Sequence, residues 1–178
     1  MDSEYIRTLS NSSAYLPCYI QGIGKCTKVL SKTGEEIVLS YSVNKIIKDS
    51  CAINLKDIES IRYICSNITG RSKIFPIFIN ENLLYMPIKA VKPFIKGDPC
   101  MGYINIHDVI EYDFDNKSVK LSCGKKIKYL ENSETIKKRI GCCSIIKEGC
   151  LQFIRQGDPV YYDKSIHKKR ELFHLIKI

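Results

Sequence analysis

The chain has 178 residues, which is enough for one domain or one domain with an appendage. Its formal net charge of +9 and its pI of about 9.0 favour nucleic acid or an anionic membrane surface as partner over a small-molecule substrate. No apolar run approaches the roughly 20 residues of a membrane-spanning helix, and the N-terminus lacks the pattern of a secretory signal peptide. We therefore expect a cytoplasmic protein with no membrane partner.

The N-terminal part of the chain predicts an antiparallel meander. Residues 1–12 are polar and are expected to be a flexible N-terminus, ahead of a single domain over residues 13–157 and a tail over residues 158–178. Strands are predicted over residues 15–20, 25–31 and 36–40, because glycine-containing turns separate apolar runs there. Ser42 is placed to cap a short helix, and a second helical pattern begins at Leu55 and ends at Gly70.

The middle of the chain predicts further strands. Residues 74–79 and 83–88 are two apolar runs joined by a short polar turn, and Pro76 and Pro87 predict an edge or a bulge because proline has no backbone donor. Residues 101–114 are expected to be a long strand with a bulge or an end at Asp108. Its apolar face is predicted to carry five residues, Ile104, Ile106, Ile110, Tyr112 and Phe114.

The most basic stretch lies between Lys117 and Arg139, with eight Lys or Arg and only two acids, whereas the first 70 residues are almost balanced. It predicts a β-hairpin with its turn at Gly124, followed by a long helix from Asn132 whose apolar residues recur at helical spacing. The expected fold class is therefore α+β, with an antiparallel sheet core, several helices and a long helix after a basic hairpin.

Three cations, Lys137, Lys138 and Arg139, fall in the first two turns of that helix. A helix N-terminus carries partial positive charge, so cations there are unfavourable unless an external anion compensates them. We expect Lys125, Lys126 and Lys128 of the hairpin, together with these three, to bind phosphates. A solvated basic face without a ligand remains the alternative.

Catalytic motifs are absent from the sequence, which holds no phosphate-binding glycine loop, nucleophile elbow or metalloprotease helix. A cysteine–histidine nucleophile and a zinc site from Cys100, His107 and Cys123 are alternatives that lack diagnostic spacing. Nine cysteines without a Cys-x-x-Cys pair predict reduced, mostly buried thiols. We expect no enzyme activity, no cofactor and no metal.

Gly70-Arg71-Ser72-Lys73 places an arginine at a flexible corner after the second helix. Arginine is suited to narrow minor grooves, where the negative potential is strongest. Arg71 and Lys73 are therefore candidate minor-groove contacts. A helix C-cap followed by a merely exposed arginine is the alternative interpretation.

Five segments in the same order resemble the competence transcription factor family, ComK: KIIKDSC, TGRSK, FPIFINENLLYMPI, DPCMGYINIHDVIEYDF and VKLSCGKKIKYLENS. The resemblance implies a sequence-specific transcriptional activator that binds paired A/T tracts of double-stranded DNA through the minor groove. It further implies a dimer or tetramer, contact with RNA polymerase and a nucleoid-associated location. The chain departs from the family at residues 55–64, which look longer, and at Tyr103, where the family often has Trp.

The tail also resembles the family segment that a proteolytic adaptor recognises, through a basic pair followed by Leu172 and Phe173. Packing of an amphipathic tail on the domain or on a second copy is the alternative. For the whole chain, the alternative to a DNA-binding activator is a regulatory interaction module that binds a transcription regulator or polymerase and has only non-specific affinity for DNA.

Overall fold

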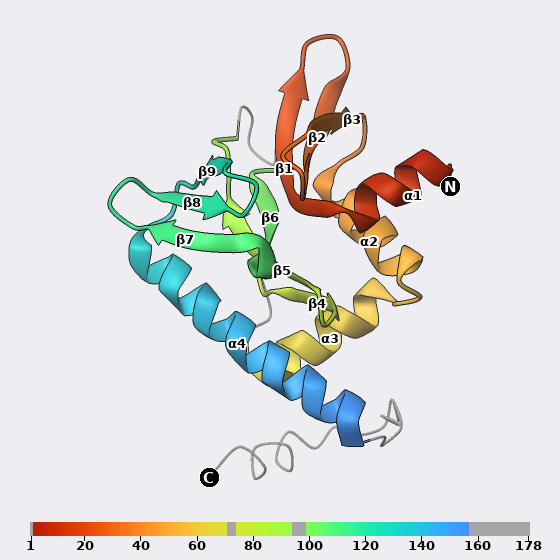
Figure 1. Cartoon of the computed structure of the whole chain (residues 1–178), viewed down its shortest axis with the longest axis vertical. Coiled ribbons are helices and arrows are strands. Elements are labelled where there is room, and N and C mark those ends of the chain that lie inside the picture. Colours follow the sequence, from red (N-terminus) through yellow and green to blue (C-terminus); the bar gives the residue numbers. More distant parts are fainter. Residues whose placement is uncertain (1, 71–73, 94–98, 157–178) are drawn as a thin grey trace.

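The architecture is described here from a computed structural model that covers residues 2–70, 74–93 and 99–156. It confirms the α+β class, since helices accompany a six-stranded antiparallel sheet and a three-stranded sheet (Figure 1). Among the described residues, no helix has the length and apolarity needed to cross a bilayer.

The large sheet consists of two antiparallel meanders. The first contains β1 (Ser12–Ile20), β2 (Gly24–Ser31) and β3 (Glu36–Leu39), and the second contains β4 (Ile77–Asn80), β5 (Leu83–Lys89) and β6 (Met101–Asn105). The strand order is β3-β2-β1-β6-β5-β4, so β3 and β4 are its edges. The turn before β2 uses Gly22 and Gly24 at positive φ, as the glycine spacing predicts.

The strand that joins the two meanders into one sheet is β1, which pairs with β6. This ladder is two residue pairs long, Ala14 with Ile104 and Tyr15 with Tyr103. Directly beside it, a Cβ placed on Gly102 would lie 2.8 Å from the carbonyl oxygen of Tyr15. Glycine is therefore required at position 102 because the backbone of β1 passes too close for any side chain.

Helices begin where polar side chains cap their free N–H groups. α2 (Val43–Ile53) begins after Ser42, whose hydroxyl accepts from the backbone of Lys45, and α3 (Ile58–Thr69) ends at Gly70 in the left-handed conformation. Both features confirm the predictions.

The expectation of a flexible segment over residues 1–12 is not met by the structure. Residues 3–10 form helix α1 (Ser3–Ser10), capped by Asp2, and β1 already begins at Ser12. Leu9 is fully buried, and the hydroxyl of Tyr5 donates to Asp49 of α2 at 2.7 Å. Contacts of this kind with residues distant in sequence fix a segment that is largely polar, which explains why composition alone did not predict the helix.

The predicted long strand over residues 101–114 is in fact two strands in different sheets. After β6, a 3-10 turn η1 (Ile106–Asp108) redirects the chain into β7 (Val109–Asp113). The buried amide of Asn105 fixes the turn, accepting from the backbone of His107 and donating to Asp108. Because three helical residues break the two-residue alternation, Ile110 is 59% exposed instead of lying on the predicted apolar face.

The three-stranded sheet has the order β7-β8-β9, with β8 at Ser118–Leu121 and β9 at Lys126–Lys128. The long helix α4 (Ser133–Gln156) follows it and runs along β5, β4 and α3 (Figure 1). The amide oxygen of Asn132 accepts from the backbone of Thr135, which makes Asn132 the expected N-cap. One cluster of buried apolar side chains includes residues of both sheets and of the four α-helices in the described ranges.

Gly102→Ala and Gly141→Ala should change stability in opposite directions. The first substitution forces Cβ against the rigid backbone of β1 and should cost about 1–3 kcal/mol. At Gly141 on α4 a Cβ meets nothing within 4 Å, so alanine should add up to about 1 kcal/mol through helix propensity. Urea unfolding of both variants and of the wild type measures the change in the free energy of unfolding. Loss of stability at both positions would contradict the assigned geometry.

Candidate nucleic-acid interface

The β8–β9 hairpin separates apolar from basic side chains by strand alternation. Val119 and Ile127 pair across the strands and are buried, while Lys126 and Lys128 point to the opposite face and are exposed. Lys120 of β8 lies directly across from Lys126. The turn at Gly124 has positive φ, as predicted. One face of the hairpin therefore carries three lysines.

The tip of the hairpin contacts the first meander. Glu36 of β3 forms ion pairs with Lys28 of β2 at 3.0 Å and with Lys125 at 3.3 Å. Hydrogen bonds from Lys28 and then from Lys125 lower the pKa of the Glu36 carboxyl. Beside them a Cβ on Gly34 would lie 3.5 Å from the Cβ of Cys123, so the two turns are in van der Waals contact. Lys28 is thereby joined to the lysines of the hairpin.

We call these residues the basic surface: Lys28, Lys120, Lys125, Lys126 and Lys128. Its acids include Glu36, Glu111, which lies 4.0 Å from Lys120, and Asp113, which is in register with Ser118 and, through it, with Lys128. Within the described part of the chain, neither Lys126 nor Lys128 forms an ion pair with a carboxylate. These two lysines are therefore the most available cations of the surface for an external anion.

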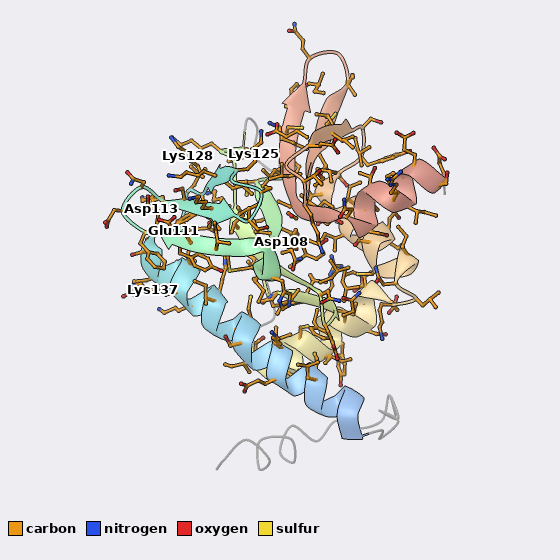
Figure 2. The ribbon with its side chains drawn as sticks, viewed as in Figure 1. Asp108, Glu111, Asp113, Lys125, Lys128 and Lys137 are labelled. Atoms are coloured by element: carbon orange, nitrogen blue, oxygen red, sulfur yellow. The ribbon has the colours of Figure 1, made fainter. Side chains whose placement is uncertain are left out.

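Lys137 and Lys138 do not belong to the basic surface. The ammonium of Lys137 lies 5.0 Å from the centre of the Phe114 ring, which stacks on Tyr112 with 6.1 Å between ring centres. Figure 2 shows Lys137 on the side of the small sheet next to α4, whereas Lys125 and Lys128 lie beyond β9. Lys138 is exposed and 3.8 Å from Glu134 on its own helix. The predicted phosphate contacts are thus divided between two sides of the sheet.

Arg139 is not a surface cation, and its predicted role in phosphate binding is wrong. Its side chain is 7% exposed and forms an ion pair at 2.5 Å with Glu131, which is 11% exposed. The Arg139 guanidinium also donates to the carbonyl oxygen of Pro87 at 2.7 Å. An external phosphate would have to displace both partners from a buried site, which is strongly unfavourable.

The surroundings of Arg139 also explain why β5 can contain a proline at position 87. β4 pairs with β5 only as far as Tyr85, so β5 has one free edge from Pro87 onward. The Pro87 carbonyl points to that edge, and in an antiparallel strand the nitrogen of the same residue points the same way. The missing donor of Pro87 therefore costs no ladder hydrogen bond, as the prediction of an edge requires. Lys89 completes this edge by donating to Glu131 at 2.7 Å and accepting from Leu130 at 2.9 Å.

Four predicted site residues lie outside the described residues: Arg71, Lys73, Leu172 and Phe173. The structure describes the chain up to Gly70, which ends α3, and again from Ile74.

Sequence reasoning did not select Lys28 and Lys120 as site residues. Lys120 lies in the basic stretch, and its alternation with buried Val119 could have assigned it to the exposed face. Lys28 could not have been selected, because it is joined to the hairpin through ion pairs of Glu36, which is distant in sequence from Lys125. The burial of Arg139 could have been predicted from helical spacing. Arg139 lies three residues after Ile136 and four before Cys143, and both of these belong to the buried stripe of α4.

The alternative of a zinc site finds no support in the described part of the chain. No group of three His, Cys, Asp or Glu residues in it is arranged to hold a metal ion, so Cys100, His107 and Cys123 do not form the zinc site considered above. All nine cysteines are free, and six of them are buried, in agreement with the predicted role as small apolar residues.

Comparisons with known proteins gave no match to any family model, curated protein or solved structure. The resemblance to the ComK family and the functions it implies therefore remain predictions.

Arg139→Ala should be far more destabilising than substitution of its neighbour Lys138. Removal of Arg139 leaves the Glu131 carboxylate buried without its partner, at an expected cost of about 3–5 kcal/mol. Lys138→Ala removes an exposed ion pair and should change stability by less than about 1 kcal/mol. Chemical denaturation of the two variants provides the comparison. Similar small losses would show that Arg139 is solvated and free to bind phosphate.

Proposed function

We propose that this chain is a DNA-binding transcriptional regulator, and that the basic surface is where it contacts the phosphates of double-stranded DNA. The observation that carries the proposal is the pair Lys126 and Lys128, exposed on one face of β9 and without a carboxylate partner in the described residues. The net charge of +9 adds a long-range attraction for a polyanion.

The spacing of these lysines suits a nucleic-acid backbone. Residues two apart on a strand lie roughly 7 Å apart on the same face, and each DNA strand has a phosphate every 3.4 Å or so along the helix axis. Lys126 and Lys128 can therefore reach separate phosphates of one strand, and Lys120 extends the contact across the hairpin. Such contacts supply affinity and orientation but no sequence preference.

Sequence preference is proposed to come from Arg71 and Lys73 in the minor groove of paired A/T tracts, as the resemblance to ComK implies. On this proposal the chain acts as an activator, binds DNA as a dimer or tetramer in the nucleoid and contacts RNA polymerase. Recognition of Leu172 and Phe173 by a proteolytic adaptor would regulate its abundance. Lys137 and Lys138 remain secondary candidates for phosphate binding, on the helix side of the hairpin.

A regulatory interaction module remains the second candidate function. The exposed apolar edge of the sheet at β3 supports it. This edge strand exposes Ile37 at 39% and Val38 at 46%, on opposite faces of the sheet. A free edge with apolar side chains is suited to pairing with a strand of another protein. The module would bind DNA weakly and without sequence preference, so DNA-binding experiments separate the two candidates.

Removal of Lys126 and Lys128 should weaken binding to any DNA and reduce its salt dependence. Wild type and the Lys126→Ala/Lys128→Ala variant are titrated against a paired A/T-tract duplex and a GC-rich duplex of equal length across salt concentrations. Two lost phosphate contacts should lower the slope of log K against log salt by about 2. The matched control is Lys48→Ala/Lys56→Ala, which removes equal charge from exposed positions at and beyond α2. Equal losses in both variants would mean that only net charge matters.

Arg71→Ala should reduce the preference for the A/T duplex over the GC-rich duplex in the same titration. A narrow A/T minor groove holds an inserted arginine more tightly than a GC groove does, so its loss should weaken A/T binding more. Circular dichroism of the variant provides the folding control. Equal losses on both duplexes would remove Arg71 from the proposed minor-groove contact.

A further inference from the structure

The hairpin formed by β1 and β2 extends beyond the rest of the large sheet as a two-stranded ribbon. On one side β6 pairs with β1 at residues 14 and 15, and on the other side β3 pairs with β2 over residues 27–30. The last three pairs of the ladder, over residues 18–20 and 24–26, therefore have no third strand beside them in the described structure. In Figure 1 the turn of this hairpin lies at the top, beyond every labelled element.

The turn at the end of this ribbon presents one apolar side chain between two glycines. Ile23 is 63% exposed, and Gly22 and Gly24 on either side of it both have positive φ. A Cβ on either glycine would meet nothing within 4 Å, so open space surrounds the turn. The tip of the hairpin is therefore narrow, and the isoleucine is its most prominent apolar group.

The same hairpin is positively charged. From Ser12 to Ser31 its sequence contains two lysines and neither Asp nor Glu. Lys25 lies directly across the ribbon from Tyr19, and Lys92 lines the same small cavity as these two residues. The other lysine, Lys28, belongs to the basic surface. The base of the ribbon is thus part of the proposed phosphate contact, and its tip extends that contact outward.

The length of the ribbon suits the depth of a DNA groove. Four residues separate Lys28 from Gly24, which corresponds to roughly 14 Å along a strand. The minor groove is only about 7.5 Å deep and 6 Å wide. With Lys28 at the phosphates that border the groove, the turn can therefore reach the base pairs. A two-stranded ribbon can enter so narrow a groove only if the groove opens, and a kink in the DNA opens it.

We propose that the β1–β2 hairpin inserts Ile23 between two base pairs from the minor groove and thereby bends double-stranded DNA. An apolar side chain that enters a base step from this groove unstacks the step and kinks the duplex toward the major groove. The inference rests on the proposed function, because it requires a chain that binds DNA. It adds an activity to that function, since phosphate contacts through the basic surface do not by themselves bend the duplex.

Three features together favour DNA as the partner of this tip. A single exposed isoleucine is ordinary on a protein surface, but this one ends a projecting ribbon, the ribbon contains no acid, and its base is joined to the basic surface through Lys28. An anionic membrane would also attract the lysines. Binding to a membrane, however, strengthens with the apolar area that it buries, and a tip with one isoleucine between two glycines offers little.

The test is energy transfer between two dyes at the ends of the paired A/T-tract duplex, measured at protein concentrations that saturate binding. The wild-type chain should increase the transfer, because wedges of this kind bend DNA by roughly 20–90°. Ile23→Ala should remove about half of the increase or more, since alanine is too short to separate two stacked base pairs. Ile23→Leu should retain the increase, because leucine also acts as a wedge. Binding of the wild type with unchanged transfer would overturn the inference.

Two further variants serve as controls, with circular dichroism to confirm their folding. Ile145→Ala shortens another isoleucine, which is 50% exposed on α4, and should leave bending unchanged. Lys126→Ala/Lys128→Ala should bind more weakly but bend the duplex as the wild type does once binding is saturated. Equal loss of bending in Ile23→Ala and Ile145→Ala would contradict the role of the tip.

The proposed function and this inference fail in different ways. Absence of DNA binding by the wild type would refute both, whereas binding without bending would refute the inference alone. A parallel titration uses vesicles of phosphatidylcholine and phosphatidylglycerol. If Ile23→Ala lost affinity for these vesicles and bent DNA as the wild type does, the tip would be a membrane contact and the inference would be wrong.

Discussion

The ion pair between Glu131 and Arg139 determines how the C-terminal half of the molecule is assembled. Glu131 follows β9, Arg139 lies in α4, and together they satisfy the backbone of β5 at Pro87 and Lys89, where β4 no longer covers it. A free strand edge in the interior would otherwise leave polar groups without partners. The pair therefore holds the small sheet, the long helix and the large sheet in one arrangement. Burying the two charges together adds little to the free energy of folding. Removing one of them would cost much more, because the other charge would stay buried without a partner.

This arrangement explains why a run of charges along the chain is not the same as a charged surface. The basic stretch supplies one buried arginine, two lysines on the helix side and four on the opposite face of the hairpin or its turn. The basic surface is completed by Lys28, which is far away in sequence and is joined only through Glu36. Because strand alternation and turn contacts sort the cations, the available charge is smaller and more localised than the sequence indicates. Any anion bound there meets Glu36 and Glu111 as well.

Local signals predicted much of the fold. The cap at Ser42, the left-handed Gly70, the turn at Gly124 and the helix beginning after Asn132 depend on residues within one or two turns of each other. Errors arose where a distant residue decides the outcome. α1 depends on contacts such as that of Tyr5 with Asp49, and the change of sheet after β6 depends on Asn105 fixing a helical turn. For the candidate site, the exposed face of the hairpin was predictable by alternation, whereas the membership of Lys28 and the partner of Arg139 were not.

The ladder between β1 and β6 has a consequence for synthesis of the chain on the ribosome. The first meander contains only neighbouring strands and can form as soon as it emerges, but the inner edge of β1 has no partner until residues 103 and 104 have been made. Pairing between segments so far apart in sequence is slow, because a long loop must close first. During that interval an unpaired strand edge is exposed to other nascent chains. Pro17 lies on this strand beyond the short ladder and has no donor to offer to a foreign strand, which limits mispairing at that point.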